Sequence, residues 1–264
     1  MTVPVTNCFR STLDNLTVPG ELARQLRRAD DFVHLGVTAG HGVLAGCMEK
    51  GGFSAKKTGM YLGSAFGPMQ TNFEVLDQVV TQQPVSPILF SLSVFNTAAG
   101  YIASILGIRG CSVTLTDFSF PFFRALQQGM AAIESGMLDR CLVLQVETYS
   151  DVLIDGTSRY GGGAEPWPAG VVCWLLERTA LSGKPLFLLE DLEIESGGTE
   201  GKDRLSLQET VSLGGKQETT PGYLGAAAML SRLLVKEGRL GVNPCRVESL
   251  YGTVCMNIRS FEGV

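Results

Sequence analysis

Histidine is nearly absent from this chain of 264 residues, which has only His34 and His41. The two lie in one helical pattern, two turns apart and on nearly the same face. A histidine pair that binds a metal usually sits four residues apart, so we interpret both as packing or surface residues. The seven cysteines form no CxxC pair, which leaves a zinc site unsupported. We expect no metal and no cofactor.

Charge is also sparse, since charged residues make up 18% of the chain and the net charge is −5. This balance excludes the basic footprint of a nucleic-acid-binding protein. The odd number of cysteines, with Cys141 and Cys173 inside apolar runs, is typical of reduced, buried thiols. The first residues show no basic-plus-apolar signal pattern. These features together predict a cytoplasmic protein.

One long uncharged stretch, from Pro84 to Ile108, is easily mistaken for a membrane span. Pro87, Asn96 and several serines and threonines argue against that interpretation. A buried strand running into a buried helix explains the stretch better, so we expect no membrane span.

Hydrophobic periodicity and turn residues predict alternating helices and strands. Besides the central stretch treated next, helices are expected at 21–48, 71–80, 96–106 and 223–237. Strands are expected at 58–64, 170–177, 185–195 and 247–254, with a strand or loop at 89–93. Loops are expected where glycine, proline and polar residues gather, at 1–20, 150–168 and, as a mobile loop, 197–220.

The most informative stretch runs from Gly110 to Glu147. It begins with a short β-branched strand at 113–116 and turns into a helix at Pro121, which the first helical turn tolerates. Gly136 ends that helix, and residues 141–146 form a second apolar strand. A strand, a helix and another apolar strand form a βαβ unit, which predicts an α/β fold with a buried parallel sheet.

Ser119 lies in the strand-to-helix turn of this unit. A side chain at a helix N-terminus is well placed to bind an anion or to act as an activated nucleophile. Serine is also among the best N-cap residues. The residues alone leave both interpretations of Ser119 open.

An ordered set of motifs resembles the β-ketoacyl synthases of fatty-acid and polyketide assembly. Asn96–Gly100 resembles the N-x-x-A-G helix of that family, Leu106–Gly110 its L-G-x-x-G turn, and Gly222–Met229 its G-H-x-x-G-A-A-G helix start. The resemblance is clearest over residues 25–180. It implies a thiolase-like, layered α-β-α fold, truncated relative to a full ketosynthase. We expect a single domain over 1–264, with 181–264 as a reduced second half.

The departures from the family concern its catalytic positions. Ser119 stands where the family has its nucleophilic cysteine, and Gly222 stands at one histidine position. For the other histidine motif the only candidate is Tyr251, a match that conflicts with the first in chain order, and either way the chain offers no catalytic histidine. A thiolate is accessible near neutral pH, whereas a serine hydroxyl needs a base. Each lost acid–base step costs about 10²–10⁴-fold in rate, so we expect no catalytic residue and no condensing activity of the chain alone.

The resemblance therefore implies a non-catalytic subunit of the chain length factor type, similar to the short ones of type II polyketide and aryl-polyene systems. Such a subunit forms a heterodimer with a full-length ketosynthase and shapes the tunnel for the acyl chain that an acyl carrier protein delivers. In such dimers the strand before the nucleophile pairs across the two-fold, here Ser112, Val113, Thr114 and Leu115. Four aromatic residues suit either a tunnel wall or ordinary core, namely Phe118, Phe120, Phe122 and Phe123.

Two other functions stay open. Ser119 could serve as the nucleophile of an acyltransferase or hydrolase of acyl thioesters, with Asp117 or a tyrosine assisting. A module that binds acyl carrier protein without a ketosynthase would use basic side chains, although the acidic overall charge weakens that case. The candidates for the latter are Arg24, Arg27, Arg28 and Arg124.

Overall fold

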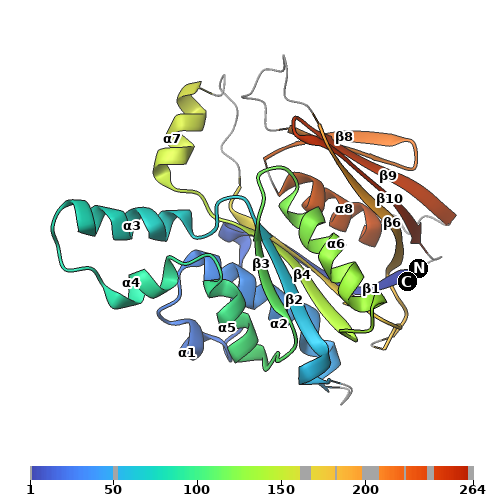
Figure 1. Ribbon diagram of the computed structural model, residues 1–264, viewed down its shortest axis with the longest axis horizontal. Helices are drawn as coiled ribbons and strands as arrows, with labels where there is room; N and C mark the ends of the chain where they lie inside the picture. Colours follow the sequence, from blue (N-terminus) through green and yellow to red (C-terminus); the bar gives the residue numbers. More distant parts are fainter. Residues whose placement is uncertain are drawn as a thin grey trace.

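One ten-stranded mixed sheet runs through the molecule (Figure 1), in the order β3-β2-β4-β5-β1-β6-β10-β9-β7-β8. The computed structural model describes residues 2–49, 53–160, 168–181, 183–197, 208–222, 224–236 and 241–260. The strands are β1 (Val3–Thr12), β2 (Thr58–Ser64), β3 (Ser112–Thr116), β4 (Arg140–Glu147), β5 (Gly170–Glu177), β6 (Phe187–Ser196), β7 (Gln208–Leu213), β8 (Lys216–Pro221), β9 (Gly241–Ser249) and β10 (Gly252–Ser260).

Eight α-helices accompany the sheet in the described residues. They are α1 (Ala23–Leu26), α2 (Asp31–Glu49), α3 (Met69–Val80), α4 (Pro87–Leu92), α5 (Thr97–Leu106), α6 (Pro121–Glu134), α7 (Asp151–Tyr160) and α8 (Gly225–Lys236). Short 3₁₀ turns lie at Leu13–Asn15 and Ala55–Lys57.

The parallel part of the sheet is the predicted βαβ unit with one strand inserted. β3 and β4 both run parallel to β2, which lies between them, and α6 connects β3 to β4. β5 then pairs antiparallel with β4, and β1 antiparallel with β5. Apolar side chains fill β4 and β5, whose residues are all buried, as expected for strands covered on both faces.

Two hydrophobic clusters lie on opposite faces of this part of the sheet. The first joins α2 and α5 to β2, β4 and β5. The second surrounds α6 and α8 and also includes side chains from β6, β7, β9 and β10. The sheet therefore curls so that both of its halves pack on α6 and α8, which gives the layered arrangement that the motifs imply.

Trp174 on β5 shows how the second cluster connects the two halves. Its ring centroid lies 4.9 Å from that of Phe122 on α6 and 5.1 Å from that of Phe187 on β6. Its indole N–H donates to the Ser231 hydroxyl on α8 at 2.7 Å. One buried side chain thus contacts both helices and both sheet halves, and its only polar atom has a partner.

The second half of the sheet has one buried face. On β10, Val254, Met256 and Ile258 are buried and alternate with more accessible residues. The accessible side carries ion pairs such as Arg259–Glu190 and Arg246–Glu248. This alternation is typical of an antiparallel sheet with one face on the core and one in water.

Several predicted segments match the structure. The strand at 58–64 is β2, the helix at 71–80 is α3, and the strands at 170–177 and 185–195 are β5 and β6. The helix at 96–106 is α5, and its C-cap Gly107 has φ +69°, a left-handed conformation that favours glycine.

The N-terminal predictions were wrong at two places. Residues 3–12 form β1 rather than a loop, because a strand between β5 and β6 buries Val3 and Val5. The predicted helix at 21–48 is divided into α1 and α2, since the Asp30 carboxylate accepts the Val33 N–H at 2.9 Å and starts a new helix.

The uncharged stretch 84–108 contains no strand. Ser86 caps α4, with Pro87 in its first turn, so the predicted strand or loop at 89–93 is helical. Its side chains are also less buried than predicted, since Phe90 is 60% exposed. Within the described residues, no helix is both long and apolar enough to span a membrane.

The predictions for the C-terminal part missed one helix and several strands. Residues 151–160 of the predicted loop form α7, and residues 208–221 form a β7–β8 hairpin whose turn has positive φ at both Gly214 and Gly215. The single strand predicted at 247–254 is a hairpin of β9 and β10 that turns at Leu250 and Tyr251. The remainder of those loops, 161–167 and 198–207, lies outside the described residues.

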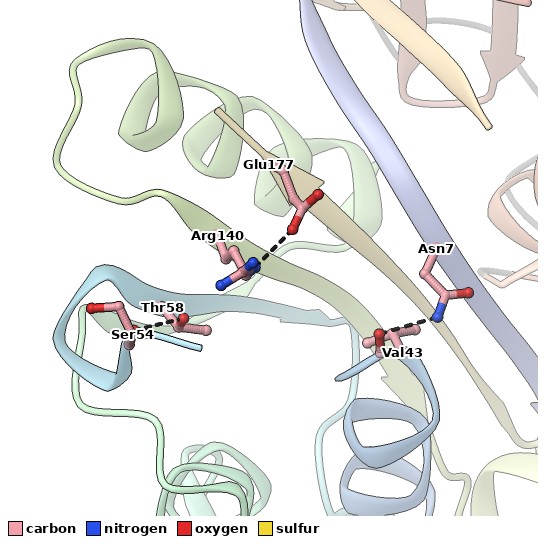
Figure 2. A network of polar contacts seen from close by, with 6 residues as sticks. All are labelled: Asn7, Val43, Ser54, Thr58, Arg140 and Glu177. Atoms are coloured by element: carbon pink, nitrogen blue, oxygen red, sulfur yellow. Dashed lines mark hydrogen bonds and ion pairs between the residues drawn. The ribbon is translucent and has the colours of Figure 1, made fainter. Parts of the chain in front are cut away.

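Buried polar contacts fix the register of the first half (Figure 2). Arg140 and Glu177 face each other across β4 and β5, with the Arg140 Nε donating to a Glu177 carboxylate oxygen at 2.7 Å. Their side chains are 4% and 0% exposed. Asn7 donates to the Val43 carbonyl at 3.1 Å and thereby attaches β1 to α2.

We predict that Glu177→Gln destabilises the protein by roughly 3–5 kcal/mol, because it removes the charge of a buried partner of Arg140. Urea denaturation monitored by circular dichroism measures this change. Asp155→Asn is the control, since it removes an exposed ion pair with Arg159 and should cost at most about 1 kcal/mol. Equal effects of the two variants would contradict the prediction.

Candidate functional site

The carboxyl ends of β2, β3 and β4 meet at one edge of the parallel sheet. Ligands of α/β proteins usually bind at such an edge. Ser119 lies there, between the end of β3 at Thr116 and the start of α6 at Pro121. Gly63 on β2 allows this approach, because a Cβ at that position would collide with the Pro121 carbonyl.

Asp117 organises the turn that carries Ser119. One of its carboxylate oxygens accepts the backbone N–H groups of Ser119, at 2.5 Å, and Phe120, at 2.9 Å. The other oxygen lies 3.4 Å from the Nε of Arg124. The N-cap residue of α6 is Phe120, which makes no side-chain cap, so the predicted capping role of Ser119 is wrong and Asp117 satisfies these amides instead.

Ser119 lines a small cavity together with residues from the second half of the chain. The cavity has a volume of about 10 Å³, the space of about one water molecule. Its walls bring Ser119 together with Gly222 and Tyr251. The other lining residues are Gln208, Glu209, Ser249 and Leu250. Tyr223, next to Gly222, lies outside the described residues.

Glu209 is a buried acid of this cavity that the sequence analysis did not identify. It lies on β7, and its carboxylate accepts the Ala226 N–H in the first turn of α8 at 2.8 Å. Burial raises the pKa of Glu209 to about 8; the Ala226 hydrogen bond opposes this shift and the charge of Glu147 adds to it. The carboxyl group is therefore mostly protonated at pH 7.

Glu147 is a second buried acid, at the carboxyl end of β4. Its carboxylate accepts the Ala65 N–H at 2.8 Å, the Gln145 side-chain amide at 2.9 Å, the Ser64 hydroxyl at 3.1 Å and the Phe66 N–H at 3.4 Å. Burial raises the pKa of Glu147 to about 7 against the effect of these four donors. Glu147 therefore has a structural role, because it fixes the loop that follows β2 through the backbone N–H groups of Ala65 and Phe66.

No imidazole reaches this site. His34 makes a 2.9 Å hydrogen bond to the Leu26 carbonyl, and His41 lies 3.4 Å from the Glu21 carboxylate, both on α2. The interpretation of the two histidines as packing or surface residues is thus confirmed. In the part of the chain that the structure describes, no cluster of three metal-ligating side chains occurs.

The four phenylalanines of the predicted tunnel wall fall into two groups. Phe120, Phe122 and Phe123 are at most 2% exposed and belong to the core around α6. Phe118 is 52% exposed and packs edge-to-face on Phe66, with ring centroids 5.6 Å apart. Only Phe118 among them lies at the surface.

The predicted dimer strand is an edge strand. β3 begins the sheet order and pairs only with β2. The Cys111 carbonyl and the Asp117 N–H both bond to β2, so the backbone groups of the odd-numbered residues face β2 and those of Ser112, Thr114 and Thr116 face the open edge.

The arginines proposed for binding acyl carrier protein do not form one patch. Arg24, Arg27 and Arg28 are exposed on or just after α1, which packs into the cluster on the α2 face. Arg124 lies on α6, on the opposite face of the sheet, beside Asp117.

We predict that Glu209 makes stability depend on pH. Its pKa is higher in the folded protein than the ordinary value of 4.5, so the folded state holds the proton more tightly than the unfolded chain. Stability is therefore lost as pH rises from about 4.5 to about 8, by at most about 1.4 kcal/mol per pH unit.

Glu209→Gln should reduce this dependence and leave the part that Glu147 contributes below about pH 7, because the amide cannot ionise but can still accept the Ala226 N–H. Urea midpoints at pH 5, 6, 7 and 8 give the measurement, with Glu193→Gln, at an exposed position of β6, as the control. A wild-type slope in Glu209→Gln would show that the prediction fails.

Comparison with known proteins identifies the fold. Residues 54–154 match the β-ketoacyl synthase N-terminal domain, and no curated protein matches the chain. The ishigamide ketosynthase/chain length factor has a TM-score of 0.62 and 19% identity over 74% of this chain and 68% of that chain. Ketosynthase ApeO in complex with its chain length factor ApeC, from Xenorhabdus doucetiae, has a TM-score of 0.64 and 15% identity over 98% of this chain and 99% of the matched chain.

A third solved structure is AntDE:AntF, a type II polyketide synthase acyl carrier protein in complex with its ketosynthase bound to the hexaketide. It has a TM-score of 0.59 and 18% identity over 74% of this chain and 69% of that chain. These matches confirm the predicted α/β, thiolase-like fold. We conclude that residues 54–154 are similar to the β-ketoacyl synthase N-terminal domain and that the chain shares the fold of these ketosynthase and chain length factor structures.

Proposed function

We propose that this protein is a non-catalytic subunit of the chain length factor type, which pairs with an active ketosynthase and shapes the tunnel for the growing acyl chain. The observation that carries this proposal is the composition of the cavity at Ser119. Ser119 stands at the family's nucleophile position, and the described residues that line its cavity include no cysteine and no histidine.

For the alternative, a Ser119-dependent acyltransferase or hydrolase, the two carboxyl groups near Ser119 are poor bases, which leaves Tyr251 as the candidate in the cavity. Asp117 is occupied by two backbone N–H groups and by Arg124. The pKa of Glu209, raised to about 8 by burial, favours its protonated form at pH 7, and a protonated carboxyl group cannot accept the proton of a serine hydroxyl. The surroundings of Ser119 therefore support a non-catalytic role.

The similar structures suggest which partners to propose for this protein. The matched chain in the ApeO–ApeC structure is covered to 99% by a match that spans 98% of this chain, so the two have nearly the same length. We extend these complexes to this protein. We propose that a ketosynthase is its heterodimer partner and that an acyl carrier protein delivers the acyl chain. The seven cysteines are free thiols, which supports a cytoplasmic location.

The tunnel role is best supported for one of the four phenylalanines. Phe118 follows the edge strand β3 directly and is half exposed, whereas Phe120, Phe122 and Phe123 fill the core. In a heterodimer that pairs through Ser112–Leu115, Phe118 would lie nearest to the partner. We propose Phe118 as the residue that contacts the acyl chain, with the other three supporting α6.

We predict that Ser119→Ala leaves condensation by the heterodimer within about twofold of wild type, because general acid–base steps, worth about 10²–10⁴-fold, depend on the partner alone. The measurement is the rate of acyl chain elongation by the complex with the full-length ketosynthase encoded nearest to this chain. The matched control replaces the nucleophilic cysteine of the ketosynthase with alanine and should abolish the rate. A loss of more than tenfold in Ser119→Ala, or an acyl adduct on Ser119 found by mass spectrometry, would favour the alternative function.

We further predict a stable one-to-one complex with that ketosynthase in solution, measured by light scattering after size-exclusion chromatography. Thr114→Pro should weaken it, because proline removes a donor from the open edge of β3 without removing a bond to β2. Thr114→Val keeps the donor and is the control. The circular dichroism spectrum shows whether each variant is folded. A homodimer that ignores the ketosynthase would count against the proposed function.

A further inference from the structure

A second cavity, larger than the one at Ser119, lies beside the start of α8. Its volume is about 100 Å³, against about 10 Å³ for the cavity at Ser119. Its walls come from the end of β1, the start of β5 and the start of α8. Among the residues that line it are Arg10, Thr12, Val171, Leu224, Gly225 and Ala228. We call this space the α8 cavity.

The α8 cavity lies where β1 separates from β6. β1 pairs with β5 from Val5 to Thr12, but it pairs with β6 only at Val3–Val5. From residue 7 onward, β1 therefore has a paired strand on one side only among the described residues. α8 packs across β1 and β5 at this place. The space between these three elements is thus a consequence of the sheet topology.

Two polar side chains of β1 lie on the α8 face of the sheet. Cys8 packs against the hydrophobic cluster that surrounds α6 and α8, whereas Phe9 packs against the cluster on the opposite face. Side chains alternate between the two faces along a strand. Arg10 and Thr12 therefore lie on the same face as Cys8, toward α8.

The cavity has a charged opening and an apolar floor. Arg10 is exposed, whereas Val171 and Leu224 are 0% and 6% exposed. A ligand that enters past Arg10 therefore meets apolar side chains behind it. Small-molecule sites usually have this composition, with mainly apolar walls and a few polar groups that fix the orientation of the ligand.

The charge of the cavity is positive. Arg10 is the only charged residue among the described residues that line it, and no ion pair of Arg10 occurs in the described part of the chain. The Thr12 hydroxyl oxygen accepts the Asn15 side-chain N–H at 2.7 Å, so its own proton is available to a ligand. Gly225 is the first residue of α8, and the helix dipole at that end also favours a negative charge.

We infer that the α8 cavity binds a short-chain carboxylate. The Arg10 guanidinium can donate two parallel hydrogen bonds to the carboxylate, and Val171, Leu224 and Ala228 offer apolar contacts to a short alkyl chain. Sites for drug-sized ligands have volumes of roughly 300 Å³ or more, so this smaller cavity limits the ligand to a few heavy atoms. Inorganic phosphate would match Arg10 but not the apolar floor. The inference is independent of the proposed function, because it concerns a different cavity and needs no ketosynthase.

The test is a titration of the full chain, in the form in which it purifies, with acetate, propionate and butyrate at constant ionic strength. Isothermal titration calorimetry gives the dissociation constants. Affinity should rise about fourfold with each added methylene group, because each one leaves water for the apolar floor. Inorganic phosphate, and butanol, which lacks the charge, should both bind more weakly than butyrate. Phosphate binding tighter than butyrate binding, or the absence of saturable butyrate binding, would overturn the inference.

Two variants separate the contact to the carboxylate from the contact to the alkyl chain. Arg10→Gln should weaken butyrate binding at least about tenfold, because it removes charge-assisted hydrogen bonds, and it should keep the gain per methylene group. Ala228→Leu narrows the apolar floor and should remove that gain. Circular dichroism shows whether each variant is folded.

Arg24→Gln is the matched control for the arginine variant. Arg24 is an exposed arginine of α1, and it too has no ion pair in the described residues. This variant should bind butyrate as the wild type does. If Arg10→Gln and Arg24→Gln bind butyrate equally well, the carboxylate does not bind in the α8 cavity and the inference is wrong.

Discussion

The site region depends on a carboxylate that is held without access to water. Glu147 is fully buried at the end of β4 and takes two of its hydrogen bonds from the backbone of residues 65 and 66, just after β2. An ionised group in that position would be very unfavourable without donors. Gly67 continues the same loop, accepts a bond from the Thr148 hydroxyl and packs on Phe95. Residues 147 and 148 thus attach the end of β4 to the loop between β2 and α3.

Strand pairing and apolar packing join the two halves of the sheet. β1 is the first strand in sequence but lies in the middle of the sheet, pairing with β5 along its length and with β6 at Val3–Val5. Trp174 packs on both sides of this junction. Gly222 and Tyr251 therefore reach the cavity of Ser119 through core packing.

The sequence predicts the βαβ unit well because its signals are local. Proline at the start of α6, Gly136 after its end and the apolar run of β4 each act within a few residues of where they stand. The misassigned segments depend on distant partners. β1 has proline and polar residues and becomes a strand only because β5 and β6 lie on either side, and the β7–β8 hairpin is polar because its outer face meets water.

The candidate site shows the same division. The resemblance of the motifs singles out Ser119 and Gly222, but no pattern around Glu209 indicates that β7 would bury its side chain beneath α8. The sequence also gives no measure of exposure, so the stretch 84–108 suggests a buried segment although much of α4 faces water. Burial is a property of the assembled fold, and periodicity predicts it poorly in a segment that is apolar on every face.

The turn that carries Ser119 has a structural role that does not depend on the chemistry of that residue. The turn is built by Gly63, which admits α6, and by Asp117, which satisfies the amides of residues 119 and 120. Neither task involves the chemistry of residue 119. The same turn ends the edge strand β3 and positions Phe118 against Phe66. The fold therefore tolerates a residue other than cysteine at position 119, whereas a change in the turn would disturb the edge strand and the surface around Phe118.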